Sequence, residues 1–371
     1  MFTDFTPSSK TQWLAQIEKD LKGKPFDDLR WHLGEDFVFE PFYHQEDNER
    51  KNIGFASSND WNICETIEVE NEDYKTANRL ALNALMGGAN ALNFVISNDT
   101  SANEMEILLQ DIELSYVATH FFFVGKKTRL AQKKLEHFYT IAKKRGNDTS
   151  LLKGSLHIAP LGHAPNWANT SALVAWINTN LPSFKAITVN ACSFHTEPEN
   201  VADELAKTIA LANDFLSELS KQGMSLEAVN NTLQFTISID KSYFINIAKI
   251  RALKLLYLNV LKAYQVENNT LPPIIASFAS LSFDENENIN MIRATTMALS
   301  AVNGGVDTLD VLPSDYRNSP FGRRIARNVQ HLLKMESYID KVSDPSAGSY
   351  YIEKLTETIA TKAWEKFQKM A

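Results

Sequence analysis

Eight short apolar runs, each followed by an amphipathic stretch, constrain the fold of this chain more than any other feature. Such runs, rich in β-branched and aromatic residues, predict strands, and the stretches between them predict helices. Several runs lack polar alternation, as expected of strands covered on both faces. The predicted strands are Asn62–Val69, Ala89–Ile96, Tyr116–Val124, Gly154–Ala159, Lys185–Ala191, Thr232–Ile239, Pro273–Ser280 and Val306–Val311.

The number and spacing of these units favour a closed barrel. They run from residue 62 to residue 311, close to the roughly 250 residues of a typical (β/α)8 barrel. The alternative is a doubly wound open sheet, which usually has fewer strands and a glycine-rich phosphate loop after the first. Thr66–Tyr74 contains no glycine. We therefore predict an α/β fold, a (β/α)8 TIM barrel with an N-terminal extension and a C-terminal helix.

Polar residues at the expected helix starts support the same rhythm. Ser101 and Glu104 have the spacing of a capping box. Ser319-Pro320 reads as an N-cap followed by a first-turn proline. Asn71 and Asp240 precede two further amphipathic stripes and are predicted to cap them.

Segments on either side of the barrel divide the chain into three predicted parts. Residues 1–60 form an N-terminal arm with a helix over Lys10–Leu21 and a segment rich in aromatic residues. Residues 61–340 form the barrel, and residues 341–371 form a helical tail, with a helix from about Ile352 to Phe367. The arm is the predicted partner contact, through Trp13, Trp31, Phe37, Phe39, Phe42 and Tyr43.

Composition excludes several classes of function. The net charge of −8 disfavours binding to nucleic acid, whose phosphates an acidic chain repels. Two cysteines, Cys64 and Cys192, fit a reducing compartment better than a disulfide framework. No targeting segment and no apolar run of about 18 residues is evident. We expect a cytoplasmic protein that does not contact membranes.

Two stretches carry a family resemblance. One begins Arg324-Ile325-Ala326-Arg327-Asn328-Val329-Gln330 and continues with Asp344-Pro345-Ser346-Ala347-Gly348-Ser349-Tyr350-Tyr351-Ile352-Glu353. The other is Ile247-Ala248-Lys249-Ile250-Arg251-Ala252. Both resemble the methylmalonyl-CoA mutase family, as do Leu21-Lys22-Gly23 and Pro41-Phe42-Tyr43 near the start.

The resemblance implies a known reaction. The family interconverts methylmalonyl-CoA and succinyl-CoA through radicals that adenosylcobalamin supplies. A barrel holds the acyl-CoA and a separate α/β domain holds the cobalamin. In some bacteria a catalytic large subunit pairs with a degenerate small one. A closed barrel would shield the radicals from water, while the cofactor carries the difficult chemistry.

Where this chain departs from the family pattern, it resembles the small subunit of the family. The cobalamin lower-ligand motif D-x-H-x-x-G is absent, as is the substrate-contacting R-x-Y-(A/T)-G segment. The family's Tyr-His pair is here Phe194-His195, which lacks the phenol oxygen. Asp307 and Asp310 replace a family Gln and His, and acids are unfavourable near acyl-CoA phosphates. The prediction is no confident catalytic residue, with Phe194 and His195 a degenerate site.

Other candidate residues are given structural roles. The family-motif residues are expected to form a network that fixes the last helix: Arg324, Arg327, Asn328, Gln330, Asp344, Gly348 and Glu353. Metal binding is disfavoured, because His120, His157 and His163 lack ligand spacing on one element. Large aromatic rings are candidates to fill the barrel instead, and the sequence leaves open which of them point inward: Phe94, Phe121, Phe122, Phe123 and Phe235.

Three functions therefore stay open. The first is a non-catalytic small subunit whose partner, the large subunit, binds adenosylcobalamin, so that no cofactor is expected on this chain. The second is a catalytic acyl-CoA mutase barrel that uses a cobalamin domain on a separate chain. The third is a stand-alone acyl-CoA-binding barrel.

Overall fold

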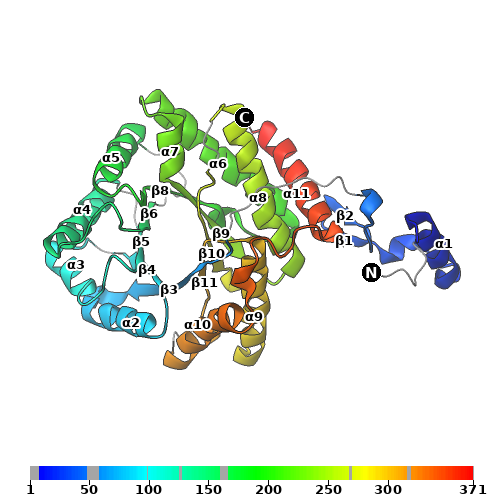
Figure 1. Cartoon of the computed structure of the whole chain (residues 1–371), viewed down its shortest axis with the longest axis horizontal. Coiled ribbons are helices and arrows are strands. Elements are labelled where there is room, and N and C mark those ends of the chain that lie inside the picture. Colours follow the sequence, from blue (N-terminus) through cyan, green and yellow to red (C-terminus); the bar gives the residue numbers. More distant parts are fainter. Residues whose placement is uncertain are drawn as a thin grey trace.

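The computed structural model describes residues 8–47, 58–97, 99–124, 128–158, 166–266, 270–315 and 319–370. His163 and Ala159, which figure in the sequence predictions, lie outside these residues. Figure 1 shows a ring of strands surrounded by helices, with the N-terminal arm extending to one side.

Parallel strands form the ring. Within the described residues the sheet order is β7-β6-β5-β4-β3-β11-β10-β9-β8. The strands, which reproduce the eight predicted runs within a few residues, are β3 (Asn62–Val69), β4 (Ala91–Ile96), β5 (Ala118–Phe123), β6 (Gly154–Ile158), β7 (Phe184–Lys185), β8 (Ile187–Asn190), β9 (Leu233–Ile239), β10 (Ile274–Phe278) and β11 (Thr308–Asp310).

The fifth predicted strand closes the ring in two pieces. β7 pairs with β6, where Phe184 lies opposite Gly154. β8 pairs with β9, where Ile187 lies opposite Leu233. Since β11 also pairs with β3, the sheet returns on itself with Ala186 between the two short pieces. The predicted (β/α)8 barrel is confirmed, and the open-sheet alternative is wrong.

Helices cover the outside of the ring. They are α2 (Tyr74–Met86), α3 (Ala102–Leu108), α4 (Thr128–Lys144), α5 (Trp167–Asn180), α6 (Val201–Lys221), α7 (Leu226–Thr232), α8 (Tyr243–Ala263), α9 (Glu287–Gly304) and α10 (Pro320–Met335). Short 3-10 turns connect them at η3 (Glu70–Glu72), η4 (Ala191–Phe194), η5 (Pro198–Asn200), η6 (Ser280–Ser282) and η7 (Ile339–Lys341).

Helix capping follows the sequence at two of the four predicted positions. Ser101 and Glu104 form the capping box of α3, and the Ser319 side chain caps α10. The Asn71 prediction is wrong, because this residue adopts a left-handed conformation (φ 48°) and Asp73 caps α2. The Asp240 prediction is also wrong: Ser242 is the N-cap of α8, and Asp240 accepts a hydrogen bond from its backbone N–H.

The sequence left open which of the five phenylalanines fill the barrel, and four of them point outward. Successive strand residues face opposite sides of a sheet, so Phe121 and Phe235 point outward. Phe121 packs against Phe138 of α4 at 5.2 Å between ring centroids, and Phe235 against Tyr257 of α8 at 5.1 Å. Phe94 and Phe123 stack on Phe121 on the same outer side. Phe122 alone of the five lines the axis of the barrel.

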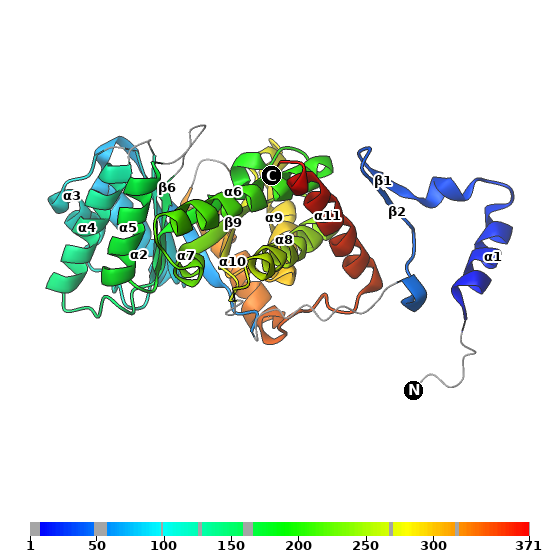
Figure 2. The ribbon, with the colours of Figure 1, turned by 90° about the horizontal axis from the view of Figure 1, so that it is seen from above.

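The N-terminal arm and the C-terminal helix meet beside the barrel. The arm holds α1 (Lys10–Leu21), η1 (Phe26–Leu29), a hairpin of β1 (Trp31–Leu33) and β2 (Phe37–Phe39), and η2 (Gln45–Asp47). Helix α11 (Tyr350–Gln368) packs on α6 and α8 and lies between the barrel and the hairpin. Figure 2 shows α1 apart from the barrel, beyond the hairpin, and α1 has no buried residue.

An ion-pair bridge holds the hairpin against the barrel. Lys366 of α11 pairs with Asp36 of the hairpin turn at 2.8 Å and with Asp203 of α6 at 2.5 Å. Phe37 and Phe39 are buried in the same core as the barrel helices. The hairpin is therefore part of the folded body, whereas α1 projects from it.

Candidate functional site

A cavity opens at the carboxyl ends of β3, β10 and β11. Barrel enzymes place their catalytic groups at this end of the strands. The cavity, which we call the mouth, has a volume of about 430 Å³ and includes Ser277 and Phe278 at the end of β10 and Val311–Pro313 after β11. Its charged lining consists of Glu65, Glu68, Glu70, Asp73, Asp310 and Arg323.

The mouth is negatively charged. Glu65 forms ion pairs with both Arg323 and Arg327, so the positive charge of Arg323 is balanced. Burial raises the pKa of Asp310 to about 6, although the Thr66 hydroxyl acts in the opposite direction. Asp310 is therefore mostly ionised at pH 7, beside Glu68, Glu70 and Asp73. An anionic ligand would meet repulsion on entering.

A second cavity lies on the barrel axis, directly below the mouth. This axial cavity has a volume of about 160 Å³ and shares Ser277 and Asp310 with the mouth. Except for Phe122 and Ile275, its lining is small or polar, with Cys64, Asn93, His120, His157, Asn190, Cys192 and Thr236. The barrel interior is thus polar rather than filled with aromatic rings.

Two buried histidines in the axial cavity are uncharged at neutral pH. Burial lowers the pKa of His120 to about 4. Burial, together with the nearby His120, lowers the pKa of His157 to about 3. Within the described residues, no three His, Cys, Asp or Glu side chains are arranged to hold a metal ion.

His195, the predicted degenerate catalytic residue, lies in a buried cluster of charged side chains. Its Nδ1 is 2.9 Å from Glu204 of α6, and its Nε2 is 3.8 Å from Asp240. Lys249 of α8 lies 3.2 Å from Glu204 and donates to the Ser238 carbonyl at 2.6 Å. Burial acts to raise the pKa of Glu204, but Lys249 and His195 outweigh it and lower that pKa.

The cluster surrounds both ring nitrogens of His195 with carboxylates. Nδ1 is hydrogen-bonded to Glu204, whereas Nε2 lies 3.8 Å from Asp240, beyond hydrogen-bond distance. Phe194 precedes it at the end of η4 and contributes no hydrogen-bonding group. Sequence reasoning missed Glu204, which is nine residues away on the next helix.

The family motif on α10 anchors that helix to the first barrel strand. Arg327 pairs with Glu65 of β3, and Gln330 accepts a hydrogen bond from the Trp61 indole N–H at 3.2 Å. Arg324 and Asn328 are exposed instead, with the Arg324 guanidinium 5.6 Å from the Phe321 ring. These contacts hold α10 rather than the last helix.

The second half of the motif converges on one buried arginine. Arg251 of α8 pairs with Asp344 and, at 2.7 Å, with Glu353 of α11. The Gly348 N–H donates to the same Glu353 carboxylate at 3.1 Å, and Gly348 has a φ of +79°. The tail is therefore fixed to the barrel wall through Arg251, a residue that is almost fully buried.

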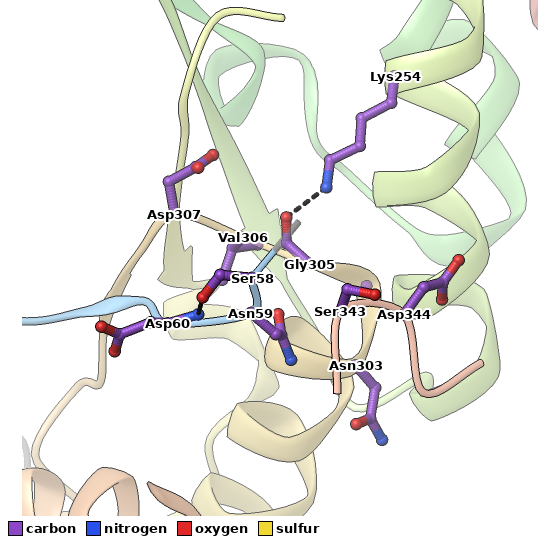
Figure 3. Close-up of a pocket in the computed structure, with 11 residues that line it drawn as sticks. Ser58, Asn59, Asp60, Lys254, Asn303, Gly305, Val306, Asp307, Ser343 and Asp344 are labelled. Atoms are coloured by element: carbon purple, nitrogen blue, oxygen red, sulfur yellow. Dashed lines mark hydrogen bonds between the residues drawn. The ribbon is translucent and has the colours of Figure 1, made fainter. Parts of the chain in front are cut away.

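Asp307 lies at the opposite end of β11 from Asp310. It accepts a hydrogen bond from the Ile274 N–H at 2.8 Å, and burial raises its pKa although that N–H opposes the shift. Figure 3 shows it beside a small pocket of about 30 Å³, in which the Lys254 ammonium points at the Gly305 carbonyl. Of the two acids that replace the family's Gln and His, Asp310 therefore lines the mouth and Asp307 does not.

The family resemblance implies adenosylcobalamin, and the described mouth residues do not fit it. A ligand to cobalt would have to be an imidazole free to leave its neighbours, whereas both nitrogens of His195 face carboxylates. The axial histidines line the narrow interior.

Comparison with known proteins places the chain in a family. A sequence model of the family described as "Methylmalonyl-CoA mutase" matches residues 97–371. The methylmalonyl-CoA mutase small subunit of Porphyromonas gingivalis is 33% identical, over 99% of this chain and 63% of its own. That of Propionibacterium freudenreichii is 24% identical, over 99% of this chain and 62% of its own.

The chain thus spans about three-fifths of the length of these relatives. Among solved structures, dihydropteroate synthase from Stenotrophomonas maltophilia superposes with a TM-score of 0.42 at 12% identity, covering 74% of this chain and 93% of its own. That likeness is too distant to bear on function. By sequence, the chain belongs to the methylmalonyl-CoA mutase family.

Proposed function

We propose that this chain is the small, non-catalytic subunit of an adenosylcobalamin-dependent methylmalonyl-CoA mutase and that it supports a catalytic large subunit. The observation that carries the proposal is the acidic mouth. Among the described residues, Glu68, Glu70, Asp73 and Asp310 line it, and Glu65 balances the charge of Arg323. Relatives named as small subunits support the same role.

The substrate of the family is an anion at both ends. Methylmalonyl-CoA carries a free carboxylate on the acyl group and phosphates on the nucleotide. Like charges about 4 Å apart at a protein surface repel by about 4 kcal/mol at an effective dielectric of 20. A mouth whose described lining holds five carboxylates and one arginine therefore opposes the anionic ligand that a catalytic barrel must admit.

We assign the cofactor to the partner subunit. Adenosylcobalamin, bound by the large subunit, would supply the radical chemistry of the complex. On this chain, His195 and Glu204 hold η4 against α6.

An acidic chain with two unpaired cysteines suits a reducing cytoplasm.

The N-terminal arm is the proposed contact with the large subunit. Of the six aromatic residues predicted for this contact, Phe37, Phe39 and Tyr43 are buried within the chain itself. Trp31 and Phe42 remain 42% and 40% exposed. Exposed aromatic side chains are typical anchors of protein interfaces.

Co-expression with a large subunit tests the assembly. The two chains should elute together in size-exclusion chromatography, and the double variant Trp31→Asp/Phe42→Asp should elute separately. Tyr116→Asp is the matched control, because Tyr116 is 83% exposed on the barrel rather than the arm. Co-elution that survives the arm variant would refute the assigned surface, and separate elution of the unaltered chains would refute the assembly.

Turnover measurements test the division of labour. The chain alone, supplied with adenosylcobalamin and methylmalonyl-CoA, should form no succinyl-CoA, whereas the complex should form it. Product from the chain alone would refute the non-catalytic role.

One observation favours the alternatives. The axial cavity is polar. A polar interior would be required in an acyl-CoA mutase barrel that uses a cobalamin domain on another chain. It would also be required in a stand-alone acyl-CoA-binding barrel. Calorimetry with methylmalonyl-CoA and acetyl-CoA separates these from the small-subunit role. Saturable binding to the isolated chain would support an alternative, and its absence would support the small subunit.

A further inference from the structure

Two polar atoms in the axial cavity lack partners among the described residues. They are the Asn93 Oδ1 and the His120 Nε2, both buried. Asn93 on β4 and His120 on β5 are paired residues of neighbouring strands, and both side chains line the cavity. A buried polar atom without a partner costs free energy, so this pair is a site for a complementary group.

The directions of the hydrogen bonds around Asn93 determine which of its side-chain atoms has no hydrogen-bond partner. The Thr66 hydroxyl donates to Asp310 Oδ2 at 2.6 Å. That hydroxyl must therefore accept from Asn93, whose Nδ2 lies 2.9 Å away. The amide orientation of Asn93 follows, and its Oδ1 faces the cavity as a hydrogen-bond acceptor.

Several other polar side chains in and around the cavity already have hydrogen-bond partners. Thr188 donates to the Leu156 carbonyl, so it accepts from the Gln234 amide, whose nitrogen also donates to His157 Nε2 at 3.1 Å. Thr236 donates to Asn190 at 2.8 Å. The Ser155 hydroxyl lies 2.7 Å from His120 Nδ1 and can donate to it, which leaves the proton of a neutral imidazole on Nε2. Asn93 Oδ1 and His120 Nε2 are then an acceptor and a donor on neighbouring strands, and neither has a partner among the described residues.

The charge and size of the cavity narrow the ligand further. The axial histidines are neutral, and Asp310 stands at the boundary with the mouth, so an anion is disfavoured. A volume of about 160 Å³ is close to the roughly 150 Å³ of an engineered cavity that binds benzene. Phe122 and Ile275 supply apolar contact for a short hydrocarbon group.

We propose that the axial cavity binds a small, uncharged primary carboxamide. The amide nitrogen donates to Asn93 Oδ1, and the amide oxygen accepts from His120 Nε2. The short alkyl end packs against Phe122. This inference concerns the chain alone and does not depend on a partner subunit.

Titration with isobutyramide and isobutyrate tests the proposal, because the two differ in charge but hardly in size. The readout is the imidazole signals of His120 in a nitrogen-15 histidine NMR spectrum. Isobutyramide should shift these signals saturably, and isobutyrate should not. No saturable shift with the amide would mean that the cavity holds water alone, and equal binding of isobutyrate would overturn the argument from charge.

Asn93→Leu removes the acceptor with little change in volume. It should weaken isobutyramide binding roughly 5- to 150-fold, the range for a lost partner to a buried polar group. Asn83→Leu, at an exposed position on α2, is the control and should leave affinity unchanged. Unchanged affinity in Asn93→Leu would overturn the assigned site. If that variant does not fold, the proposal is decided by comparing isobutyramide with isobutyrate binding to the unaltered protein.

Discussion

Replacing Glu65 by alanine should destabilise the barrel more than any exposed ion-pair variant. Glu65 receives Arg323 and Arg327 of α10, and all three side chains are 8–10% exposed. Removing one member of a buried ionic group leaves its partners charged and desolvated, which costs about 3–5 kcal/mol. Domains have only about 5–15 kcal/mol of stability, so Glu65→Ala should remove a large share of it.

The thermal effect can be scaled to the size of the chain. An unfolding entropy of about 2.1 cal/mol/K per residue gives about 0.8 kcal/mol/K for 371 residues. A loss of 3–5 kcal/mol should therefore lower the Tm by about 4–6 °C. Urea denaturation followed by circular dichroism measures the free-energy change, and calorimetry measures the Tm.

A matched control and a compensating variant sharpen the test. Glu106→Ala removes an exposed partner of Lys144 and should cost less than about 1 kcal/mol. The triple variant Glu65→Leu/Arg323→Met/Arg327→Leu replaces the whole group and should recover most of the loss. Equal destabilisation by Glu65→Ala and Glu106→Ala would refute the reasoning from burial.

Three further predictions concern other parts of the fold. Gly154→Ala should abolish folding in expression trials, because a Cβ there would lie 1.9 Å from the Thr119 carbonyl oxygen, whereas Gly146→Ala, with open space around it, should cost only about 1–2 kcal/mol. Acid should destabilise the protein below about pH 6.5. His120 and His157 have folded pKa values of about 4 and about 3, so the unfolded chain takes up more protons than the folded one. The free energy of unfolding should therefore fall by up to about 1.4 kcal/mol per pH unit for each histidine. The raised pKa of Asp310 offsets part of this loss. Urea denaturation between pH 7 and 5 measures the effect: the free energy of unfolding should fall less steeply with decreasing pH in His157→Gln than in the unaltered chain. Lys366→Met should release the arm hairpin and speed its limited proteolysis, while Lys362→Met on the same helix should not.

The barrel was predictable because its signal is local. Strand runs such as Asn62–Val69 match β3 residue for residue, since burial on both faces selects unbroken apolar stretches. The break at Ala186 has no counterpart in composition. Which rings face the axis was also unpredictable, because a one-residue shift reverses the facing of a whole strand.

The site was less predictable than the fold because its contacts are distant in sequence. Arg251 meets Asp344 and Glu353 from 93 and 102 residues away, and Glu65 meets Arg327 across 262 residues. The family motif identified most of these residues without indicating their partners. Asn93 and His120 belong to no motif, and only the register of β4 against β5 brings them together.

The split of the fifth strand at Ala186 has a consequence for how the interior could exchange its contents. Among the described residues, β7 has two residues and pairs in the sheet only with β6, while β8 has four and pairs only with β9. Elsewhere in the ring each strand bonds to a neighbour on both sides, so parting the wall at this junction breaks the fewest hydrogen bonds. Short, sparsely paired segments open at lower free energy than long ones. The wall between β6 and β9 is therefore the place where the cylinder would widen first.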